Sequence, residues 1–208
     1  MISKFMNLEK EKQERIVNAA IKEFANKGYD QASTNEIVKD ANISKGLLFH
    51  YFKNKKQLFL FVFDYCVELS VNELYGKIDF GEKDIFLRLR QIMGVKLELI
   101  RKTPHIIDFL MAAVLDESKE IKQHVEEKSK ELSENGYTRI FKDIDVSKFK
   151  KGVDIEKVMN IIIWTFEGIS ASEVKKLKHS AASSIDYKQV FKEVDRYIEI
   201  LQESFYQS

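Results

Sequence analysis

The chain has 208 residues, of which 44% are hydrophobic and 12% aromatic, so it can bury a substantial core. One proline and eight glycines disfavour a β-rich or disordered chain, and a single cysteine excludes an intramolecular disulfide. The sequence has no run of 18 apolar residues, and residues 1–8 are too polar for a signal peptide, so we expect a cytoplasmic protein without a membrane span.

The net charge of +1 is unevenly distributed along the chain. Residues 1–60 contain 11 Lys and Arg against 7 Asp and Glu, a net charge of +4, whereas the remainder has a net charge of −3. A basic segment favours nucleic-acid binding at that end of the protein. On charge alone, a solvated face without a partner remains the alternative.

The first predicted helix covers residues 8–26 and ends at Lys27 and Gly28, since glycine is a common residue at a helix C-terminus. Its buried stripe is predicted to contain Val17, Ala20, Ile21 and Phe24.

Residues 33–58 predict two short helices, a tight turn and the start of a third helix. Ser33 and Glu36 have the spacing of a capping box that begins a helix at about Thr34. Asn42 tolerates a left-handed backbone where the chain must turn, and Ser44 is a good N-cap for the second helix. This is the arrangement that places a recognition helix in the major groove of DNA.

The second helix is predicted to present a polar face to DNA. Gly46 lets the backbone approach a surface closely, while Leu48 and Phe52 face inward. The outward side chains are predicted to be Lys45, Leu47, Phe49, His50 and Tyr51. Asn54 is predicted to cap the third helix, whose N-terminus and Lys55 would both attract phosphate.

Over roughly the first sixty residues, this pattern resembles the TetR family of bacterial transcriptional regulators. The matching residues are Ile16, Ala19, Ala20, Phe24, Gly28, Tyr29, Ser33, Thr34, Ile37, Ala41, Asn42, Ile43, Ser44, Lys45, Gly46, Leu48, Phe49, His50, Tyr51, Phe52, Asn54, Lys55 and Leu58. The chain departs from the family at Asn42, where Gly is common, at Leu47, where Thr or Ser is common, and at Phe49, where Tyr is common. These departures bear on which operator is read.

The resemblance implies an all-α fold of about nine helices. It implies a helix-turn-helix DNA-binding domain over residues 1–55 and an effector-binding and dimerisation domain over residues 56–208. The DNA contacts that it implies by position are Thr34, Asn35, Ser44, Lys45, Gly46, Leu47, Phe49, His50, Tyr51 and Lys55.

The rest of the chain is predicted to be helical from its apolar periodicity. The expected helices cover residues 55–75, 84–102, 104–115, 116–135, 155–178 and 187–205, with Thr103 capping the third of these and a polar connection over 179–184. Residues 158–166 are apolar on nearly all sides, so one side is expected to meet the core and the other a second subunit. We therefore expect a homodimer formed through the two C-terminal helices.

Apolar side chains in residues 84–180 are candidates for an effector pocket, with ordinary core packing as the alternative for each. The candidates are Met93, Phe109, Leu110, Ala113, Trp164 and Phe166. Without a charged cluster among these helices, we expect a small apolar effector.

Cofactor, metal and catalytic motifs are not evident. His50, His105, His124 and His179 lack metal-site spacing, and there is no glycine-rich phosphate loop or nucleophile elbow. Cys66 is expected to be a core residue, with a redox switch as the alternative.

The leading hypothesis is a ligand-responsive transcriptional repressor, released from a palindromic operator by a small apolar effector. A helical small-molecule binding protein that does not regulate DNA is the alternative. An enzyme that uses His105 or Cys66 is a third hypothesis with little support in the sequence, so we expect no enzymatic activity.

Overall fold

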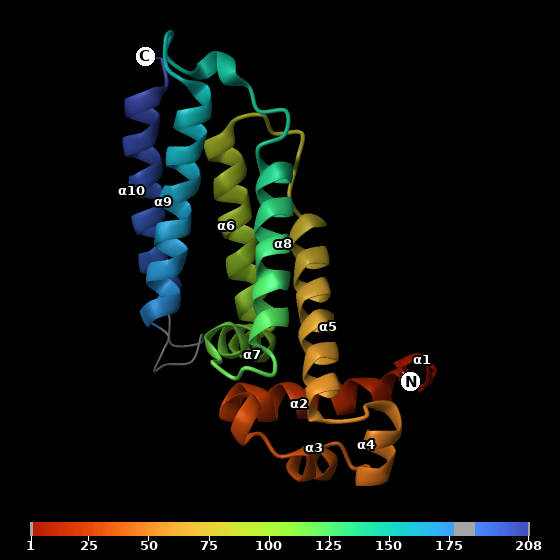
Figure 1. The fold of residues 1–208 in the computed structure, drawn as a ribbon. Helices are drawn as coiled ribbons and strands as arrows, with labels where there is room; N and C mark the ends of the chain where they lie inside the picture. Colours follow the sequence, from red (N-terminus) through yellow and green to blue (C-terminus); the bar gives the residue numbers. More distant parts are fainter. Residues whose placement is uncertain (1, 177–185, 208) are drawn as a thin grey trace. The chain divides into compact units, whose positions relative to one another are not determined.

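A computed structural model describes residues 2–176 and 186–207 (Figure 1). Within these ranges the regular structure is helical, apart from one isolated bridge between Phe149 and Tyr206, which confirms the all-α fold class. The helices are α1 (Ile2–Met6), α2 (Lys10–Gln31), α3 (Thr34–Asp40), α4 (Lys45–Tyr51), α5 (Lys55–Tyr75), α6 (Ile85–Lys102), α7 (Pro104–Leu115), α8 (Lys122–Ile140), the 3-10 helix η1 (Val146–Lys148), α9 (Ile155–Lys176) and α10 (Tyr187–Phe205).

Contacts within the chain define two compact units. Unit 1 extends to Asn72 and also includes Thr103–Lys130, and unit 2 contains Glu73–Lys102 and the chain from Glu131 onward. We predicted a boundary between residues 55 and 56 that separates a DNA-binding domain from an effector-binding domain. The compact units do not test this functional division, so it stays a prediction.

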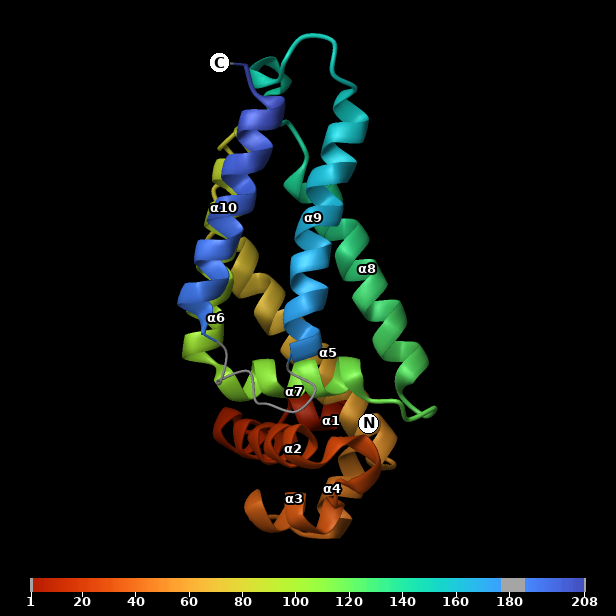
Figure 2. The same ribbon diagram turned by 90° about the vertical axis from the view of Figure 1, so that its left-hand side faces the viewer.

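In unit 1, α2 lies between α7 on one side and α3 and α4 on the other (Figure 2). Aromatic rings join these helices. Phe59 of α5 is 5.0 Å from Phe24 of α2 and 5.5 Å from Phe109 of α7, measured between ring centroids. All three side chains are at most 1% exposed, so one aromatic core holds three helices of the unit together.

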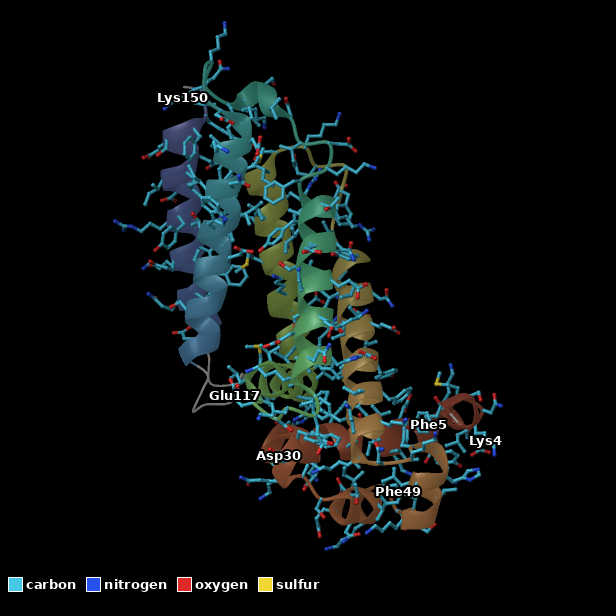
Figure 3. The ribbon with its side chains drawn as sticks, viewed as in Figure 1. Lys4, Phe5, Asp30, Phe49, Glu117 and Lys150 are labelled. Carbon is cyan, nitrogen blue, oxygen red and sulfur yellow. The ribbon has the colours of Figure 1, made fainter. Side chains whose placement is uncertain are left out.

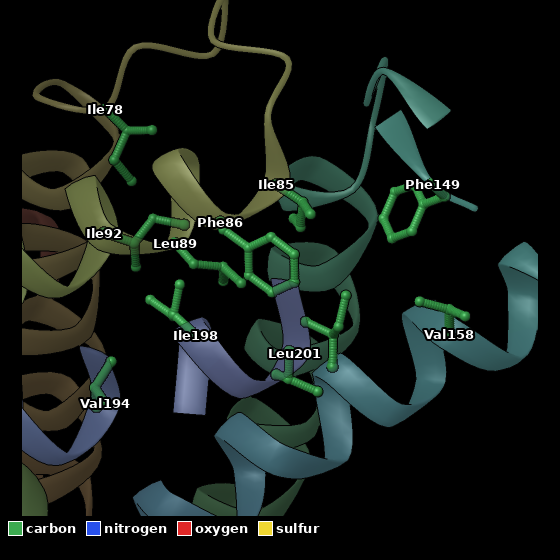
Figure 4. Packing of buried hydrophobic residues seen from close by; sticks show 11 residues of the cluster. Ile78, Ile85, Phe86, Leu89, Ile92, Phe149, Val158, Val194, Ile198 and Leu201 are labelled. Carbon is green, nitrogen blue, oxygen red and sulfur yellow. The ribbon is translucent and has the colours of Figure 1, made fainter. Parts of the chain in front are cut away.

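Unit 2 is built around an apolar cluster contributed mainly by α6, α9 and α10 (Figure 4). Arg88 of α6 is fully buried beside it. The Arg88 guanidinium donates to the carbonyl oxygens of Phe80, Glu82, Ile140 and Lys142. These bonds satisfy the buried charge and fasten the segments before α6 and after α8 to the cluster.

Most of the predicted helices agree with the structure. The predicted helix over 55–75 matches α5, and the predictions for 84–102, 104–115 and 187–205 agree with α6, α7 and α10 to within one residue. The predicted helix over 155–178 corresponds to α9, although residues 177 and 178, His179 and the predicted connection over 179–184 lie outside the described residues.

Some local details differ from the prediction. The helix predicted from 116 begins at Lys122, after a loop, and helix α1 was not foreseen. Thr103 and Ser33 are the N-cap residues of α7 and α3, as predicted, but neither makes a side-chain capping bond. The predicted capping box is also absent on its other side, since the Ser33 backbone N–H donates to the Glu23 carboxylate at 2.9 Å and not to Glu36.

Candidate nucleic-acid interface

The turn between α3 and α4 has the backbone that its sequence predicts. Asn42 adopts a left-handed conformation with φ of 52°. The N–H of Ile43 then donates to the carbonyl of Val38 at 3.0 Å, and the hydroxyl of Ser44 accepts from the N–H of Leu47 at 3.2 Å. These bonds end α3 and begin α4, so α4 projects at a fixed angle from the turn.

Helix α4 has one buried and one exposed face. Leu48 and Phe52 are each 1% exposed, which confirms that they face inward. Lys45, Gly46 and His50 are exposed. Because residues four apart lie on the same side of a helix, Gly46 and His50 share one outward line. No atom lies within 4 Å of the position that a Cβ on Gly46 would occupy, so that side is open to a partner.

Tyr51 does not belong to this outward face, which corrects our prediction for its orientation. Its side chain is only 6% exposed, and its ring lies 5.9 Å from that of Phe5 in α1. Leu47 and Phe49 are half-buried and flank the exposed line, with the Lys45 ammonium 6.0 Å from the Phe49 ring centre.

The start of α5 is capped as the sequence predicts. The side chain of Asn54 accepts from the N–H of Gln57 at 2.9 Å, and the side chain of Gln57 accepts from the N–H of Lys53 at 3.4 Å. These two bonds fix the N-terminus of the helix, where the backbone N–H groups favour an anion.

Lys55 turns back into unit 1. Its ammonium donates to the carbonyls of Asp30 at 3.0 Å and Ala32 at 3.4 Å, and it lies 4.6 Å from the ring centre of Tyr29. The side chain therefore stabilises the C-terminal end of α2, a structural role that the sequence did not indicate. The predicted contact of Lys55 with phosphate stays a prediction.

Two further predicted contacts lie at the N-terminus of α3. Asn35 is exposed and Thr34 is half-buried. Together with Ser44, which is exposed before α4, they border the turn on the same short stretch of chain.

The chain was compared with known protein families, and residues 16–62 match the family described as bacterial regulatory proteins, tetR family. That match covers the turn, α3, α4 and the start of α5. Residues 16–62 therefore match the DNA-binding region of the TetR family, which supports a DNA-binding transcriptional regulator, as the helix-turn-helix predicted.

Two curated relatives and one solved structure extend the TetR match. An uncharacterized helix-turn-helix regulator of Bacillus subtilis, YerO, is 27% identical over 87% of this chain and 71% of its own length. The probable acrEF/envCD operon repressor of Escherichia coli K12 is 34% identical, over 44% of this chain and 41% of its own length. A TetR-like regulator from Rhodococcus sp. RHA1 is 18% identical, covers 94% of each chain and has a TM-score of 0.65, which shows a common fold.

The predicted effector residues of this chain fall in both units. Phe109 and Ala113 are buried in unit 1, at 0% and 3% exposed, as the core-packing alternative expects, and Leu110 is half-buried there. In unit 2, Met93 and Phe166 pack against the apolar cluster, whereas Trp164 is 64% exposed. Their role as an effector pocket stays a prediction.

A groove in unit 1 has a volume of about 680 Å³. None of the predicted effector residues lines it. The residues around it are Ser3, Met6, Lys53, Gln57, Leu60, Phe61, Asp64, Tyr65, Glu68 and His124. His124 is 2.8 Å from the Asp64 carboxylate, so this histidine is already partnered within the unit.

Cys66 is fully buried in α5, as predicted for a core residue. Burial raises the pKa of its thiol to about 12. Because thiolate is the reactive form, this environment disfavours a redox switch. In the part of the chain that the structure describes, no acidic, histidine or cysteine residues cluster as metal ligands, and no helix is long and apolar enough to span a membrane.

Sequence reasoning missed a polar cluster at the end of α2. Gly28 interrupts the helix with φ of 67°, and the next N–H, of Tyr29, donates to the Asp116 carboxylate at 2.7 Å. The Tyr29 hydroxyl donates to Glu120, also at 2.7 Å, and burial together with this carboxylate raises its pKa. A Cβ on Gly28 would lie 3.1 Å from the Asp116 carboxylate. The close carboxylate, in addition to the positive φ, therefore favours glycine at this position. No local pattern links residues so distant in sequence.

Proposed function

We propose that the chain is a homodimeric repressor that binds a near-palindromic operator and is released from it by a small apolar effector. The observation that carries the DNA-binding part is the exposed line of α4. There Gly46 leaves open space and Lys45 and His50 offer hydrogen-bond donors. Such a helix fits the major groove, where base edges and phosphates accept hydrogen bonds.

We assign DNA contacts to the residues around this line. The set is Thr34, Asn35, Ser44, Lys45, Gly46, Leu47, Phe49, His50, Tyr51 and Lys55. We propose that His50 reads a base edge and that Leu47 touches a thymine methyl. For Tyr51, whose ring is buried, the proposed contact is through the hydroxyl. For Lys55, whose ammonium binds a backbone carbonyl, the proposed contact is through the N-terminus of α5.

The dimer is proposed to form through α9 and α10. Large apolar side chains are exposed on both helices: Ile161, Trp164, Tyr197 and Ile200 are between 39% and 64% exposed. Exposed apolar surface of this kind marks a contact with another protein surface. A second copy is the occupant we assign, because two recognition helices about 34–36 Å apart are needed to reach successive major grooves.

Release by an effector requires that the ligand bind the conformation that cannot hold DNA more tightly than the one that can. We propose that the ligand displaces α5, so that the two recognition helices no longer match both half-sites. The similarity to an operon repressor supports the repressing direction. Because a bacterial transcriptional regulator acts on DNA inside the cell, we propose a cytoplasmic location. We propose no enzymatic activity for it.

Selection of bound duplexes from a random-sequence pool, with purified protein at about 0.15 M salt, tests this function. Enrichment of a two-fold-related sequence is the expected result, and the selected operator then serves to screen apolar compounds for release. A folded dimer that enriches no sequence, and binds random duplex no better than a neutral protein does, would favour a small-molecule binding protein instead.

A further inference from the structure

We propose that helix α1 belongs to the DNA interface and that Lys4 binds a phosphate of the duplex beside His50. The inference rests on the proposed function, because it adds a second element to the surface that α4 presents. Neither the helix-turn-helix pattern nor the family match, which begins at residue 16, includes α1.

Helix α1 is anchored against α4 and α5 by Phe5. This side chain is 1% exposed, and its ring lies 5.9 Å from Tyr51, 5.1 Å from Phe52 and 5.1 Å from Phe61, between ring centroids. Figure 3 shows Phe5 and Lys4 on α1, next to α4. A helix of five residues is not stable alone in water, so its position depends on such contacts, to which Gln13 adds a bond to the Met6 carbonyl at 3.0 Å.

The anchor places Lys4 at the exposed face of α4. The Lys4 ammonium is 3.5 Å from Nε2 of His50, and both side chains are exposed. A lysine ammonium has three donors and no acceptor, so in this contact Nε2 of His50 is the acceptor. His50 can take only one of the three donors, and the others are directed to solvent or to a partner.

Lys4 has no carboxylate partner among the described residues. In contrast, Lys22 pairs with Asp40 at 3.2 Å, and Lys39 pairs with Glu36 at 3.9 Å. Lys4 therefore adds a positive charge next to the exposed His50 of α4.

The chemistry of this pair favours phosphate as the ligand. A lysine is a flexible point charge that suits a phosphate oxygen, whereas reading a base requires a fixed pair of donors and acceptors. A duplex held by α4 carries phosphates along both edges of the groove, so an adjacent ammonium gains a contact without any change in the fold. Such a contact strengthens binding to every sequence.

The test compares Lys4→Ala with the unaltered dimer, by measuring the Kd for operator and for random duplex over a range of salt concentrations. Alanine keeps the helix propensity of α1. We expect log Kd to depend less steeply on log salt, by about 1 for each half-site, with a similar loss of affinity on both duplexes. Lys151→Ala, which removes the same charge from an exposed loop of unit 2, should leave both quantities unchanged.

A second variant tests the anchor. Phe5→Ala should release α1 and weaken DNA binding at least as much as Lys4→Ala, and the double variant should bind no worse than Phe5→Ala alone. Circular dichroism at the assay temperature verifies that these variants remain folded.

The two proposals fail differently. If the unaltered protein binds duplex but Lys4→Ala keeps its affinity and its salt dependence, Lys4 is not in the interface and only this inference is overturned. A loss on operator alone would also overturn it, because a phosphate contact acts on all sequences. If the unaltered protein binds neither duplex, the proposed function and this inference are both wrong.

Discussion

The exposed face of α4 in unit 1 is polar and positively charged, whereas the exposed side chains of α9 and α10 in unit 2 include large apolar groups. On α4, Lys45, Gly46 and His50 are exposed, and Lys4 adds its charge beside them. On α9 and α10, Trp164 is 64% and Ile200 51% exposed. Both surfaces belong to helices whose inner side is packed, so the chemistry of the outer side distinguishes their proposed partners: a polyanion for one and an apolar protein surface for the other.

The largest effect is expected from an acidic group among the apolar side chains of unit 2. Ile200→Asp should prevent dimerisation, because burying an unpaired carboxylate in an apolar contact costs several kcal/mol. Affinity for a two-fold operator should fall by about 100-fold or more, since each 1.4 kcal/mol is about tenfold. Sedimentation velocity gives the oligomeric state, and a binding titration gives the affinity.

The matched control is Asn135→Asp, which adds the same charge at an exposed position of α8. It should remain dimeric and bind operator normally. A dimeric Ile200→Asp protein would show that the exposed apolar groups of α10 are not the interface. The assignment of an apolar protein partner to this surface would then be wrong.

A smaller effect is expected from His50→Ala on the polar face. A base contact contributes about 1–3 kcal/mol of discrimination, so operator binding should weaken by about 10-fold or more while random duplex loses less. Competition between operator and random duplex measures this ratio directly. Equal losses on both would assign His50, like Lys4, to the phosphates.

The smallest effect on DNA binding is expected from Lys55→Ala. Our sequence prediction was weaker binding to all duplexes and a lower salt dependence. The structure adds a loss of stability of about 1–2 kcal/mol, because the bonds to the carbonyls of Asp30 and Ala32 and the contact with Tyr29 disappear.

Urea denaturation measures the stability of Lys55→Ala, and a salt titration with random duplex measures its phosphate contact. An unchanged salt dependence together with the lower stability would remove the Lys55 side chain from the DNA face. It would then act only as an internal support.

The turn and α4 could be predicted because their signals are local. Asn42, Ser44 and Asn54 act on backbone groups within a few residues, so the start and end of each short helix follow from the sequence itself. The boundaries of α5, α6 and α10 likewise follow from apolar periodicity and flanking breakers.

The wrong orientation predicted for Tyr51 and the unforeseen internal bonds of Lys55 both come from partners that are distant in sequence. Tyr51 is buried because Phe5 packs on it from α1, and Lys55 turns inward because the carbonyls that it binds lie 25 and 23 residues earlier in the chain. Asp116 lies 87 residues from Tyr29. Periodicity shows which side of a helix is apolar, but it does not show which remote side chain will cover a polar or aromatic group.

The predicted effector residues fall in two units for a related reason. An apolar residue in a helix can face the core, a ligand or a second subunit, and the pattern is the same for all three. Phe109 faces the core and Trp164 is exposed, although both are wide aromatic residues that we predicted to line an effector pocket.

The exposure of Trp164 also gives the protein an optical reporter. It is the chain's one tryptophan, so the indole emission of the whole molecule comes from a single place on α9. An indole in water emits at longer wavelength than one enclosed by apolar groups. Dilution of the unlabelled protein should therefore shift its fluorescence to the red as subunits separate, and the same signal can follow assembly in real time without any dye.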